Sequence, residues 1–283
     1  MLVCKTPAEM QAACRDLRKS GSHTLGLVPT MGALHAGHIS LVSAALSECD
    51  SVAASIFVNP TQFAPGEDFE AYPRDFEADW RKLAAAGVHI LFAPSTADMY
   101  PPGNTTFVEP GEIGTRLDGA SRPGHFRGVA TIVARLFHIV APDRAYFGQK
   151  DAAQVAVLRH IVRDLNFPIH LGICPIVRES DGLAMSSRNC YLTAEERGRA
   201  LILSRALAAA QNLAAKGETK SEALRAAILA VFFTDPMLHL DYASIVDPDT
   251  LLPVADISRG ALIAVAAWIG KTRLIDNLIV QPQ

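Results

Sequence analysis

The chain has 283 residues, with 26 Lys and Arg side chains against 29 Asp and Glu, so its formal net charge is −3. This near-balance gives no electrostatic argument for a nucleic-acid or anionic-membrane partner. Hydrophobic residues make up 49% and charged residues 19% of the chain, which excludes intrinsic disorder and allows a large core. No run of about 18 uncharged apolar residues occurs, which argues against a membrane span.

The cysteines and the first residues bear on the compartment. Five cysteines are present without a CxxC pair, which argues against both a disulfide framework and a cysteine zinc site. The first residues lack a basic segment followed by an apolar one, so no signal peptide is predicted. Together these features predict a cytoplasmic protein.

Strand-like and helix-like segments alternate through the first part of the chain. Thr6 and Glu9 form a capping box around Pro7, which predicts a helix ending at Gly21. Strands are predicted at 24–29, 51–58, 88–93, 144–148 and 168–177, and further helices at 39–49, 75–87, 128–141 and 151–166. This alternation predicts an α/β fold, a Rossmann-like parallel sheet with helices on both faces. Such sheets bind ligands beyond the carboxyl ends of their strands.

The pattern changes after about residue 178. Thr193 and Glu196 form a second capping box, which predicts a helix to about Lys216, and another helix follows at 221–233. Three strands are predicted at 241–247, 261–269 and 273–280. We therefore predict two domains, a nucleotide-binding Rossmann-like domain over residues 1–177 and a smaller α+β domain over residues 178–283.

The first buried strand runs into a turn that contains glycines and histidines, from Pro29 to His38. Where a strand meets a helix, the helix N-terminus offers free N–H groups and a positive dipole end, which suit phosphate. His35 and His38 can donate hydrogen bonds to phosphate oxygens there. The i, i+3 spacing also suits a metal, but no third ligand has matching spacing. Nucleotide binding is favoured over a metal and over a solvated turn with incidental histidines.

Two further clusters carry polar side chains. In the first, Lys150 can neutralise a phosphate, and Asp151 can cap the helix or hold a ribose hydroxyl. Gln154 follows one turn later and can point into the same space. In the second, the hydroxyls and the arginine of residues 186–188 suit an anion clamp in a mobile loop. Taken alone, a capped turn with a surface lysine is favoured for the first cluster, and a polar loop fits the second equally well.

Several motifs of other enzyme classes fail to match. Gly270-Lys271-Thr272 resembles the end of a Walker A motif, but Val265 stands where its first glycine would fall. No G-x-G-x-x-G or G-x-S-x-G sequence is present. The sequence therefore favours chemistry without a covalent enzyme intermediate.

Taken together, the clusters resemble a known family. His35-Ala36-Gly37-His38 resembles the HxGH signature of the nucleotidylyltransferase superfamily, and Met185-Ser186-Ser187-Arg188 resembles its KMSKS-like loop. Over about residues 20–283 the chain is similar to the pantoate–β-alanine ligase family, the pantothenate synthetases. The strings that carry this resemblance stand in the family's order: PTMGALHAGH, SIFVNPTQF, RPGHFRGVATIV, FGQKDAAQ and IVRESDGLAMSSRN.

The resemblance implies an ATP-dependent ligase that joins (R)-pantoate to β-alanine and releases AMP and pyrophosphate. It implies an enzyme-bound pantoyl adenylate, a place in pantothenate and coenzyme A biosynthesis, Mg2+ with unknown protein ligands, and a homodimer with small-molecule partners. Adenylation is needed because a bare carboxylate would have to expel oxide to acylate an amine. The alternatives are a nucleotidyltransferase that moves AMP or CMP onto a phosphorylated alcohol, and a non-catalytic nucleotide-binding module.

The resemblance also implies roles for individual residues. His38 matches the family's catalytic histidine, as a proton donor or a hydrogen-bond donor, and His35, Lys150 and Arg188 share the catalytic assignment through the phosphates. Gln62 and Gln154 match the pantoate ligands, and Gln62 is also assigned to β-alanine. The residues assigned to ATP are Met31, Gly32, Ala33, Leu34, His35, Ala36, Gly37, His38, Gly148, Gln149, Lys150, Asp151, Val177, Met185, Ser186, Ser187 and Arg188.

A second tier of candidates falls in family-like strings: Tyr72, Arg122 and His125. Pro29, Met31 and Phe63 are candidate apolar walls for the gem-dimethyl group of pantoate, and ordinary packing at strand ends explains them equally well. Two departures from the family pattern, Ala36 and Gln149 where acidic residues are frequent, remove no proposed ligand.

Overall fold

The computed structural model describes residues 1–19 and 23–281. Two compact units divide the chain: Met1–Gly148 with Val157–Pro175, and Gln149–Ala156 with Ile176–Gln283. Helix α7 (Ala152–Asp164) begins in the second unit and ends in the first. The predicted domain boundary after residue 177 stays a prediction. Gly21, predicted to end the first helix, lies outside the described residues.

The first unit is built on a parallel sheet with strand order β1-β4-β3-β2-β5-β6, as the alternating pattern predicts. Nearly every residue of β2 and β3 is buried, as expected for strands that are covered on both faces. The short edge strand β1 was not predicted. The strands are β1 (Leu2–Cys4), β2 (Leu25–Thr30), β3 (Ser51–Ile56), β4 (Ile90–Phe92), β5 (Arg144–Gly148) and β6 (His170–Cys174).

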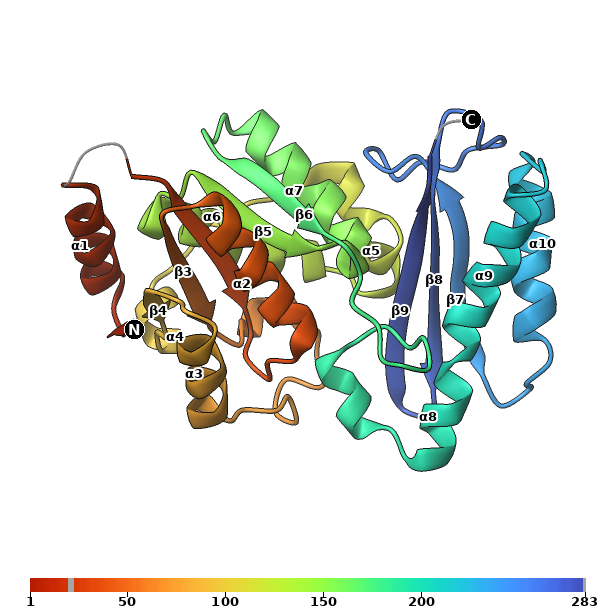
Figure 1. The fold of residues 1–283 in the computed structure, drawn as a ribbon, viewed down its shortest axis with the longest axis horizontal. Coiled ribbons are helices and arrows are strands. Elements are labelled where there is room, and N and C mark those ends of the chain that lie inside the picture. Colours follow the sequence, from red (N-terminus) through yellow and green to blue (C-terminus); the bar gives the residue numbers. More distant parts are fainter. Residues whose placement is uncertain (20–22, 282–283) are drawn as a thin grey trace. The chain divides into compact units, whose positions relative to one another are not determined.

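Helices cover both faces of this sheet (Figure 1). Helices α2 and α3 share an apolar cluster with alternate strand residues such as Val28, Val52 and Leu91. Helices α1 and α6 pack on each other. The rule that parallel crossovers are right-handed assigns them to the opposite face. The helices are α1 (Pro7–Arg18), α2 (Ala36–Glu48), α3 (Phe76–Ala85), α4 (Thr96–Met99), α5 (Asp118–Ser121) and α6 (His125–Val140), with 3-10 turns η1 (Pro60–Gln62) and η2 (Gly111–Thr115).

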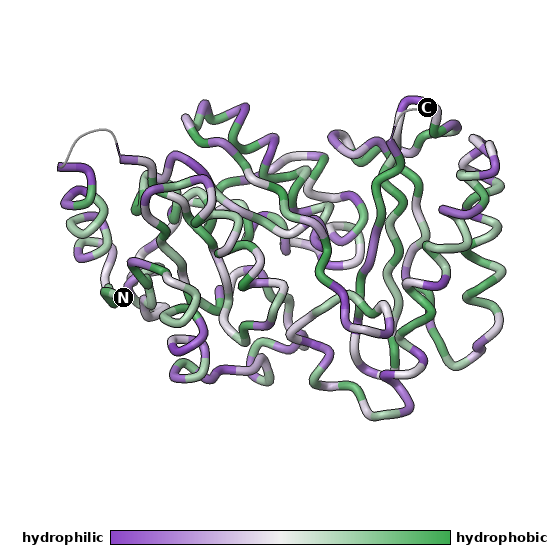
Figure 2. Tube along the Cα trace, viewed as in Figure 1, coloured by the Kyte–Doolittle hydropathy of each residue, from purple (hydrophilic) through white to green (hydrophobic). Residues whose placement is uncertain are grey.

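The second unit is the smaller α+β part, as predicted. Its antiparallel sheet has the order β7-β8-β9, and α9 and α10 pack side by side on one face (Figure 1). Hydrophobic residues run along β8 (Figure 2). Each residue of this strand is buried except Trp268. Its strands are β7 (His239–Val246), β8 (Ala261–Ile269) and β9 (Thr272–Val280); its helices are α8 (Ala194–Ala200), α9 (Ile202–Ala214) and α10 (Ser221–Phe232), with 3-10 turns η3 (Gln149–Asp151) and η4 (Ser187–Tyr191).

Two local features differ from the pattern in the sequence. The helix predicted from Thr193 to about Lys216 is divided into α8 and α9 at Leu201, where ψ is −14° and the turn tightens toward 3-10 geometry. Helix α2 begins at Ala36, earlier than the apolar pattern indicates. No helix in the described part of the chain is long and apolar enough to cross a membrane.

Candidate active site

The turn after β2 places the two histidines of the HxGH sequence at the start of α2. His35 is the N-cap residue, and its Nδ1 accepts the Gly37 N–H at 3.1 Å. His38 Nδ1 accepts the main-chain N–H of His35 at 3.2 Å, and the two rings lie 4.1 Å apart. The pair forms a capping box in which imidazoles stand where serine or threonine and glutamate usually stand.

This geometry decides which ring nitrogen carries the proton. A ring nitrogen that accepts a backbone N–H carries no proton itself, so this geometry assigns the proton of each imidazole to Nε2. Each Nε2–H is therefore a donor at the N-terminus of α2, beside the positive end of the helix dipole. Such donors at a helix start are suited to bind phosphate oxygens.

Helix α3 holds this turn in place through Asp79, which is 2% exposed. The two carboxylate oxygens of Asp79 accept the main-chain N–H groups of Leu34 at 2.8 Å and Ala33 at 2.7 Å. Lys82 Nζ donates to the Leu34 carbonyl at 2.6 Å. Gly32 and Ala33 both have a positive φ, 85° and 51°, and a Cβ on Gly32 would lie 3.0 Å from Asp79 Oδ2. The turn therefore needs both the glycine and the carboxylate.

A cavity of about 280 Å³ opens beside this turn within the first unit. Met31, Gly32 and Asp79 line it, together with residues of the loops after β3 and β4. The cavity therefore lies at the carboxyl ends of three parallel strands, where α/β sheets bind ligands.

Strand β2 also lies where the strand order reverses. It pairs with β3 on one side and with β5 on the other, and the chain continues to β4 in one direction and to β6 in the other. Ligands of open α/β sheets bind at such switch points. The stretch Met31–His38 follows β2, and Gly148 ends β5, so the structure places these predicted ATP residues at the switch point.

Gln62, a predicted pantoate ligand, is buried in the 3-10 turn η1. Asn59 Nδ2 donates to Gln62 Oε1 at 3.0 Å and to the Gly128 carbonyl at 3.1 Å, while Asn59 Oδ1 accepts the Tyr100 hydroxyl at 2.8 Å. Gln62 Nε2 lies 2.9 Å from Met31 Sδ. The structure thus joins Gln62 to the stretch assigned to ATP and shows that Asn59 orients its amide.

Arg122 and His125, two of the second-tier candidates, form a chain that ends on Gln62. Arg122 donates to both carboxylate oxygens of Glu67, at 2.7 and 2.6 Å, and its Nη1 lies 3.1 Å from His125 Nε2. His125 Nδ1 lies 2.8 Å from the Gln62 carbonyl, which can only accept, so Nδ1 carries the proton. Burial and the nearby Arg122 charge lower the pKa of His125 to about 4, so the ring is neutral at pH 7.

The apolar candidates are placed in the same unit. The Phe63 ring packs edge-on against the third second-tier candidate, Tyr72, which is buried, and their centroids are 6.1 Å apart. Pro29 lies in β2, one residue before its end. Their positions fit either a pocket wall or ordinary packing.

The second unit holds the remaining sequence-predicted residues. Lys150 and Asp151 lie in η3, with Lys150 Nζ 3.6 Å from Asp151 Oδ1, and Gln154 is in the first turn of α7. The Val177 carbonyl accepts the Met185 N–H at 2.9 Å, which brings the proposed adenine contact next to the Met185–Arg188 loop.

Hydrogen bonds within the second unit cap the Met185–Arg188 loop and hold its backbone. Ser186 is the N-cap of η4, and its Oγ accepts the Arg188 N–H at 3.3 Å. Asn189 Nδ2 donates to the Ala184 carbonyl at 3.1 Å and to Glu179 Oε1 at 3.0 Å. The backbone of the predicted anion clamp is therefore fixed within this unit, while its closure over a ligand stays a prediction.

Sequence reasoning missed two residues that hold the first unit's site. Asp79 is a carboxylate on the buried side of α3, four residues before the buried Leu83. Asn59 lies in the loop after β3, immediately before Pro60, and is 1% exposed. A charged residue at an apolar position of a helix, and an asparagine at a strand end, were the signals that could have indicated them.

The fold and this turn define a class of protein. A Rossmann-like sheet with a helix N-terminus at its switch point is the arrangement of a nucleotide-binding α/β protein, and residues 35–38 of this turn have the HxGH pattern. The profile of the Pantoate-beta-alanine ligase family matches residues 2–279, and the chain belongs to this family. It is therefore a ligase of pantothenate biosynthesis.

Similar proteins cover almost the whole chain. The pantothenate synthetase of Acidobacterium capsulatum is 57% identical over 98% of this chain and 96% of its own length, and that of Koribacter versatilis is 58% identical over 99% and 96%. The crystal structure of the Thermus thermophilus enzyme matches all of both chains with a TM-score of 0.93 and 48% identity. The Francisella tularensis pantoate–β-alanine ligase, complexed with "beta-gamma ATP" and β-alanine, matches 99% of this chain and 97% of its own with a TM-score of 0.77 and 35% identity.

Proposed function

We propose that this ligase condenses (R)-pantoate with β-alanine at the expense of ATP, through an enzyme-bound pantoyl adenylate. The observation that carries the proposal is the reciprocal cap of His35 and His38 at the start of α2, which assigns the proton of each ring to Nε2. The Francisella relative, solved with an ATP compound and β-alanine, supports the same substrates for this chain.

The reaction has two steps, adenylation of pantoate and transfer of the pantoyl group to β-alanine, and neither needs a covalent bond to the enzyme. A carboxylate oxygen of pantoate attacks the α-phosphorus of ATP, the bond to the bridging oxygen breaks, and pyrophosphate leaves with the electron pair. The neutral amine of β-alanine then attacks the acyl carbon, AMP leaves, and the new amide nitrogen loses a proton. Donors fixed near the phosphates stabilise the charge that develops on the leaving group, which is the role proposed for His38.

The first unit holds one set of proposed ligand residues. In the first unit, Met31–His38 and Gly148 are proposed to bind ATP, and Gln62 is proposed to bind pantoate and help place β-alanine. A primary amide both donates and accepts hydrogen bonds, so Gln62, oriented by Asn59, can bind both a hydroxyl and a carboxylate.

In the second unit, Lys150 and Arg188 are proposed to neutralise phosphate charge, with Ser186 and Ser187 as further donors. The remaining residues there extend the proposal to the other parts of the substrates. Gln149 and Met185 are proposed ATP contacts, Asp151 is assigned to the ribose, the Val177 backbone to the adenine, and Gln154 to pantoate.

Mg2+ is proposed to enter with ATP. This ion usually keeps several waters and is held by substrate phosphates and one or two carboxylates, not by an all-protein cage. Residues 1–19 and 23–281 contain no group of three His, Cys, Asp or Glu side chains that could hold a metal ion. Binding of Mg2+ through the phosphates of ATP requires no such group. When bound, Mg2+ neutralises phosphate charge, while the orientation of ATP is left to the residues named above.

We further propose that the enzyme works in the cytoplasm as a homodimer, as the family resemblance implies. Four of the five cysteines are buried, the fifth is exposed, and all five are free, which suits a reducing compartment. Light scattering after size exclusion tests the dimer directly, and a monomer at micromolar concentration would contradict it.

The decisive experiment is ATP–pyrophosphate exchange with pantoate and without β-alanine. Exchange should require pantoate, and 18O in the pantoate carboxylate should appear in AMP once β-alanine is added. His170→Ala, a change at an exposed position on β6, serves as the control histidine variant. A folded wild-type protein without pantoate-dependent exchange, or one whose AMP carries no label, would contradict the adenylate mechanism.

A further inference from the structure

Strand β9 carries two adjacent polar residues where its neighbours are apolar. Asp276 is 2% exposed and Asn277 is 3% exposed. Consecutive strand residues point to opposite faces, and their cross-strand partners are Val265 and Ala264. Val265 belongs to the core beneath α9 and α10, so Asp276 points to the helix-covered face and Asn277 to the other. Buried polar groups of this kind must be hydrogen-bonded, and their partners show what they do.

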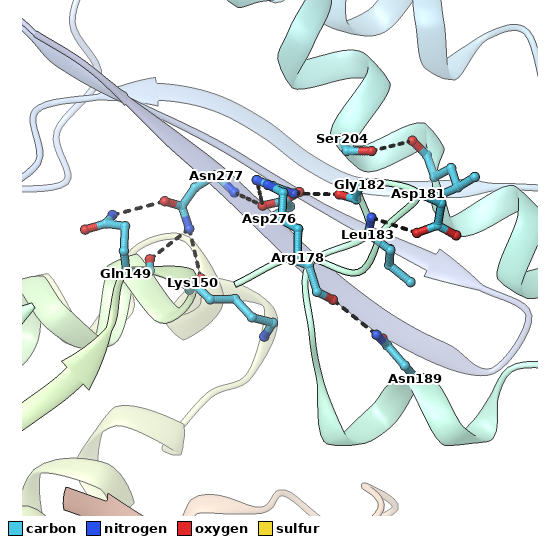
Figure 3. A network of polar contacts seen from close by, with 12 residues as sticks. Gln149, Lys150, Arg178, Asp181, Gly182, Leu183, Asn189, Ser204, Asp276 and Asn277 are labelled. Carbon is cyan, nitrogen blue, oxygen red and sulfur yellow. Dashed lines mark hydrogen bonds and ion pairs between the residues drawn. The ribbon is translucent and has the colours of Figure 1, made fainter. Parts of the chain in front are cut away.

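Asn277 holds the segment that contains Lys150. Its Nδ2 donates to the main-chain carbonyl of Gln149 at 3.0 Å and to that of Lys150 at 2.9 Å, and its Oδ1 accepts from Gln149 Nε2 at 3.0 Å (Figure 3). Both amide hydrogens and the amide oxygen are thus used on one short turn. The contact to Lys150 is to its carbonyl and does not involve its ammonium group, which lies 3.6 Å from Asp151 Oδ1.

Asp276 holds the loop that leads into Met185–Arg188. Its carboxylate accepts two hydrogen bonds from Arg178, at 2.7 and 2.9 Å, and Arg178 Nη1 also donates to the Gly182 carbonyl at 3.0 Å (Figure 3). Arg178 and Ala184 pair as an antiparallel bridge, which closes this loop into a hairpin. A bidentate pair of this kind fixes orientation as well as distance.

We propose that Asp276 and Asn277 are positioning residues that set the Lys150 segment and the Met185–Arg188 loop in one fixed register for ATP. The proposal rests on the proposed function, because that function assigns both segments to ATP. Neither side chain is itself proposed to contact the nucleotide. Because they are neighbours on one strand, the two segments cannot shift relative to each other unless a buried hydrogen bond breaks.

Direct binding of MgATP, measured by calorimetry, tests this role. Asn277→Asp keeps the size and the acceptor for Gln149 Nε2 but turns an oxygen toward two carbonyls, and Asn277→Ser removes the donors without adding charge. We expect both variants to raise the Kd for MgATP at least tenfold. Asn212→Asp, at an exposed position on α9, makes the same chemical change without these partners and should leave the Kd within twofold.

A double-mutant cycle separates positioning from general support of the fold. If Asn277 acts through Lys150, Asn277→Ser should change the Kd by less than twofold in a Lys150→Ala background, although each change alone weakens binding. In the same way, Asp276→Asn should change the Kd for MgATP by less than twofold in an Arg188→Ala background. A residue that merely stabilises the unit would instead give additive effects on the Kd.

The outcomes distinguish this proposal from the function on which it rests. Wild-type protein that catalyses pantoate-dependent exchange, with unchanged MgATP binding in a folded Asn277 variant, overturns the positioning role and leaves the function standing. Absence of exchange in the wild type overturns the function itself. Thermal melting identifies folded variants, and Asp276→Asn tests the second contact if both Asn277 variants fail to fold. Additive effects in both cycles also overturn the proposal.

Discussion

Asp79 Oδ1 lies 2.8 Å from the main-chain nitrogen of Leu34, and Asp79 Oδ2 lies 2.7 Å from that of Ala33. A carboxylate on α3 thus satisfies two amide donors of the turn that carries the paired histidines. That turn includes two residues with positive φ, a conformation that L side chains adopt at a cost. The buried charge offsets that cost, and the position of His35 and His38 depends on it.

Replacing Asp79 with asparagine should destabilise the protein and slow adenylation. The amide keeps one acceptor but turns an NH2 group toward a backbone N–H, so one charge-assisted hydrogen bond is lost and one donor is left unpaired. We expect a loss of about 1.5–3 kcal/mol in the free energy of unfolding, measured by urea denaturation. Asp75→Asn, at the N-cap of the same helix, should be nearly neutral because both residues cap well. Equal stability of the two variants would contradict this account.

His38 combines a structural and a chemical role that two substitutions can separate. His38→Asn can keep an acceptor near the position of Nδ1 but removes the Nε2–H donor, whereas His38→Ala removes both. Both variants should reduce pantoate-dependent exchange by roughly 10²–10³-fold, the scale of one lost transition-state donor. Only His38→Ala should also lose about 1 kcal/mol of stability with its capping bond. Near-normal exchange in His38→Asn would remove the Nε2–H from the mechanism.

Gly128 allows α6 to approach the segment that carries Gln62. A Cβ there would lie 2.3 Å from the Thr61 carbonyl oxygen and 2.6 Å from the Gln62 Cα, and backbone atoms cannot rotate away. Gly128→Ala should therefore cost about 1–3 kcal/mol of stability and raise the KM for pantoate, because Gln62 must move.

Gly198 in α8 is the matched control for Gly128. Apart from its chain neighbours and the backbone of its own helix, no atom of the described residues lies within 4 Å of its ideal Cβ. Gly198→Ala should therefore stabilise the protein by about 0.4–1 kcal/mol through better helix propensity and a less flexible unfolded chain. Melting temperatures of the two variants should therefore move in opposite directions. A shift in the same direction would refute the packing argument.

The lowered pKa of His125 predicts a loss of stability in mild acid. The folded protein holds this group neutral to about pH 4, whereas the unfolded chain protonates it near its ordinary pKa of 6.5. The unfolded state therefore binds the extra proton between these values, and stability falls as the pH falls from 6.5 toward 4. The slope should reach about 1.4 kcal/mol per pH unit, roughly 3 kcal/mol in all.

His125→Asn isolates this effect from the other titrating groups. The asparagine Nδ2 can replace the Nδ1–H that donates to the Gln62 carbonyl, but it does not titrate. The difference in unfolding free energy between wild type and variant should shrink steadily from pH 6.5 to pH 4.5. A difference that is independent of pH would show that the ring is not held neutral in the folded protein.

Local patterns in the sequence predict most of the fold. Buried runs such as 24–29 and 51–58 predict β2 and β3 because both faces of a parallel strand are apolar. The start of α2 was placed late because imidazoles are unusual capping groups, although the cap residues themselves were singled out for phosphate binding. Strand β1 was not predicted because a strand of three residues is too short to show a periodic pattern.

The residues that hold the site in place could not be predicted from the sequence, because their partners are far away along the chain. Asp79 binds a turn 46 residues earlier, and Asn277 binds a turn 128 residues earlier. Hydropathy counts both as surface residues, yet each is buried against a partner that periodicity cannot indicate. Candidate ligands could be read from motifs near strand ends, whereas the side chains that orient them depend on pairings created by the tertiary fold.

The place of β2 in the sheet also bears on the order in which the chain assembles. β2 pairs with β3 within the first 56 residues, but its other edge is covered by β5, which begins at Arg144. A nascent chain can therefore form the β2–β3 pair and the histidine turn early, with one strand edge open during the synthesis of almost ninety further residues. Open edges invite pairing with other chains, so this interval exposes the growing protein to aggregation.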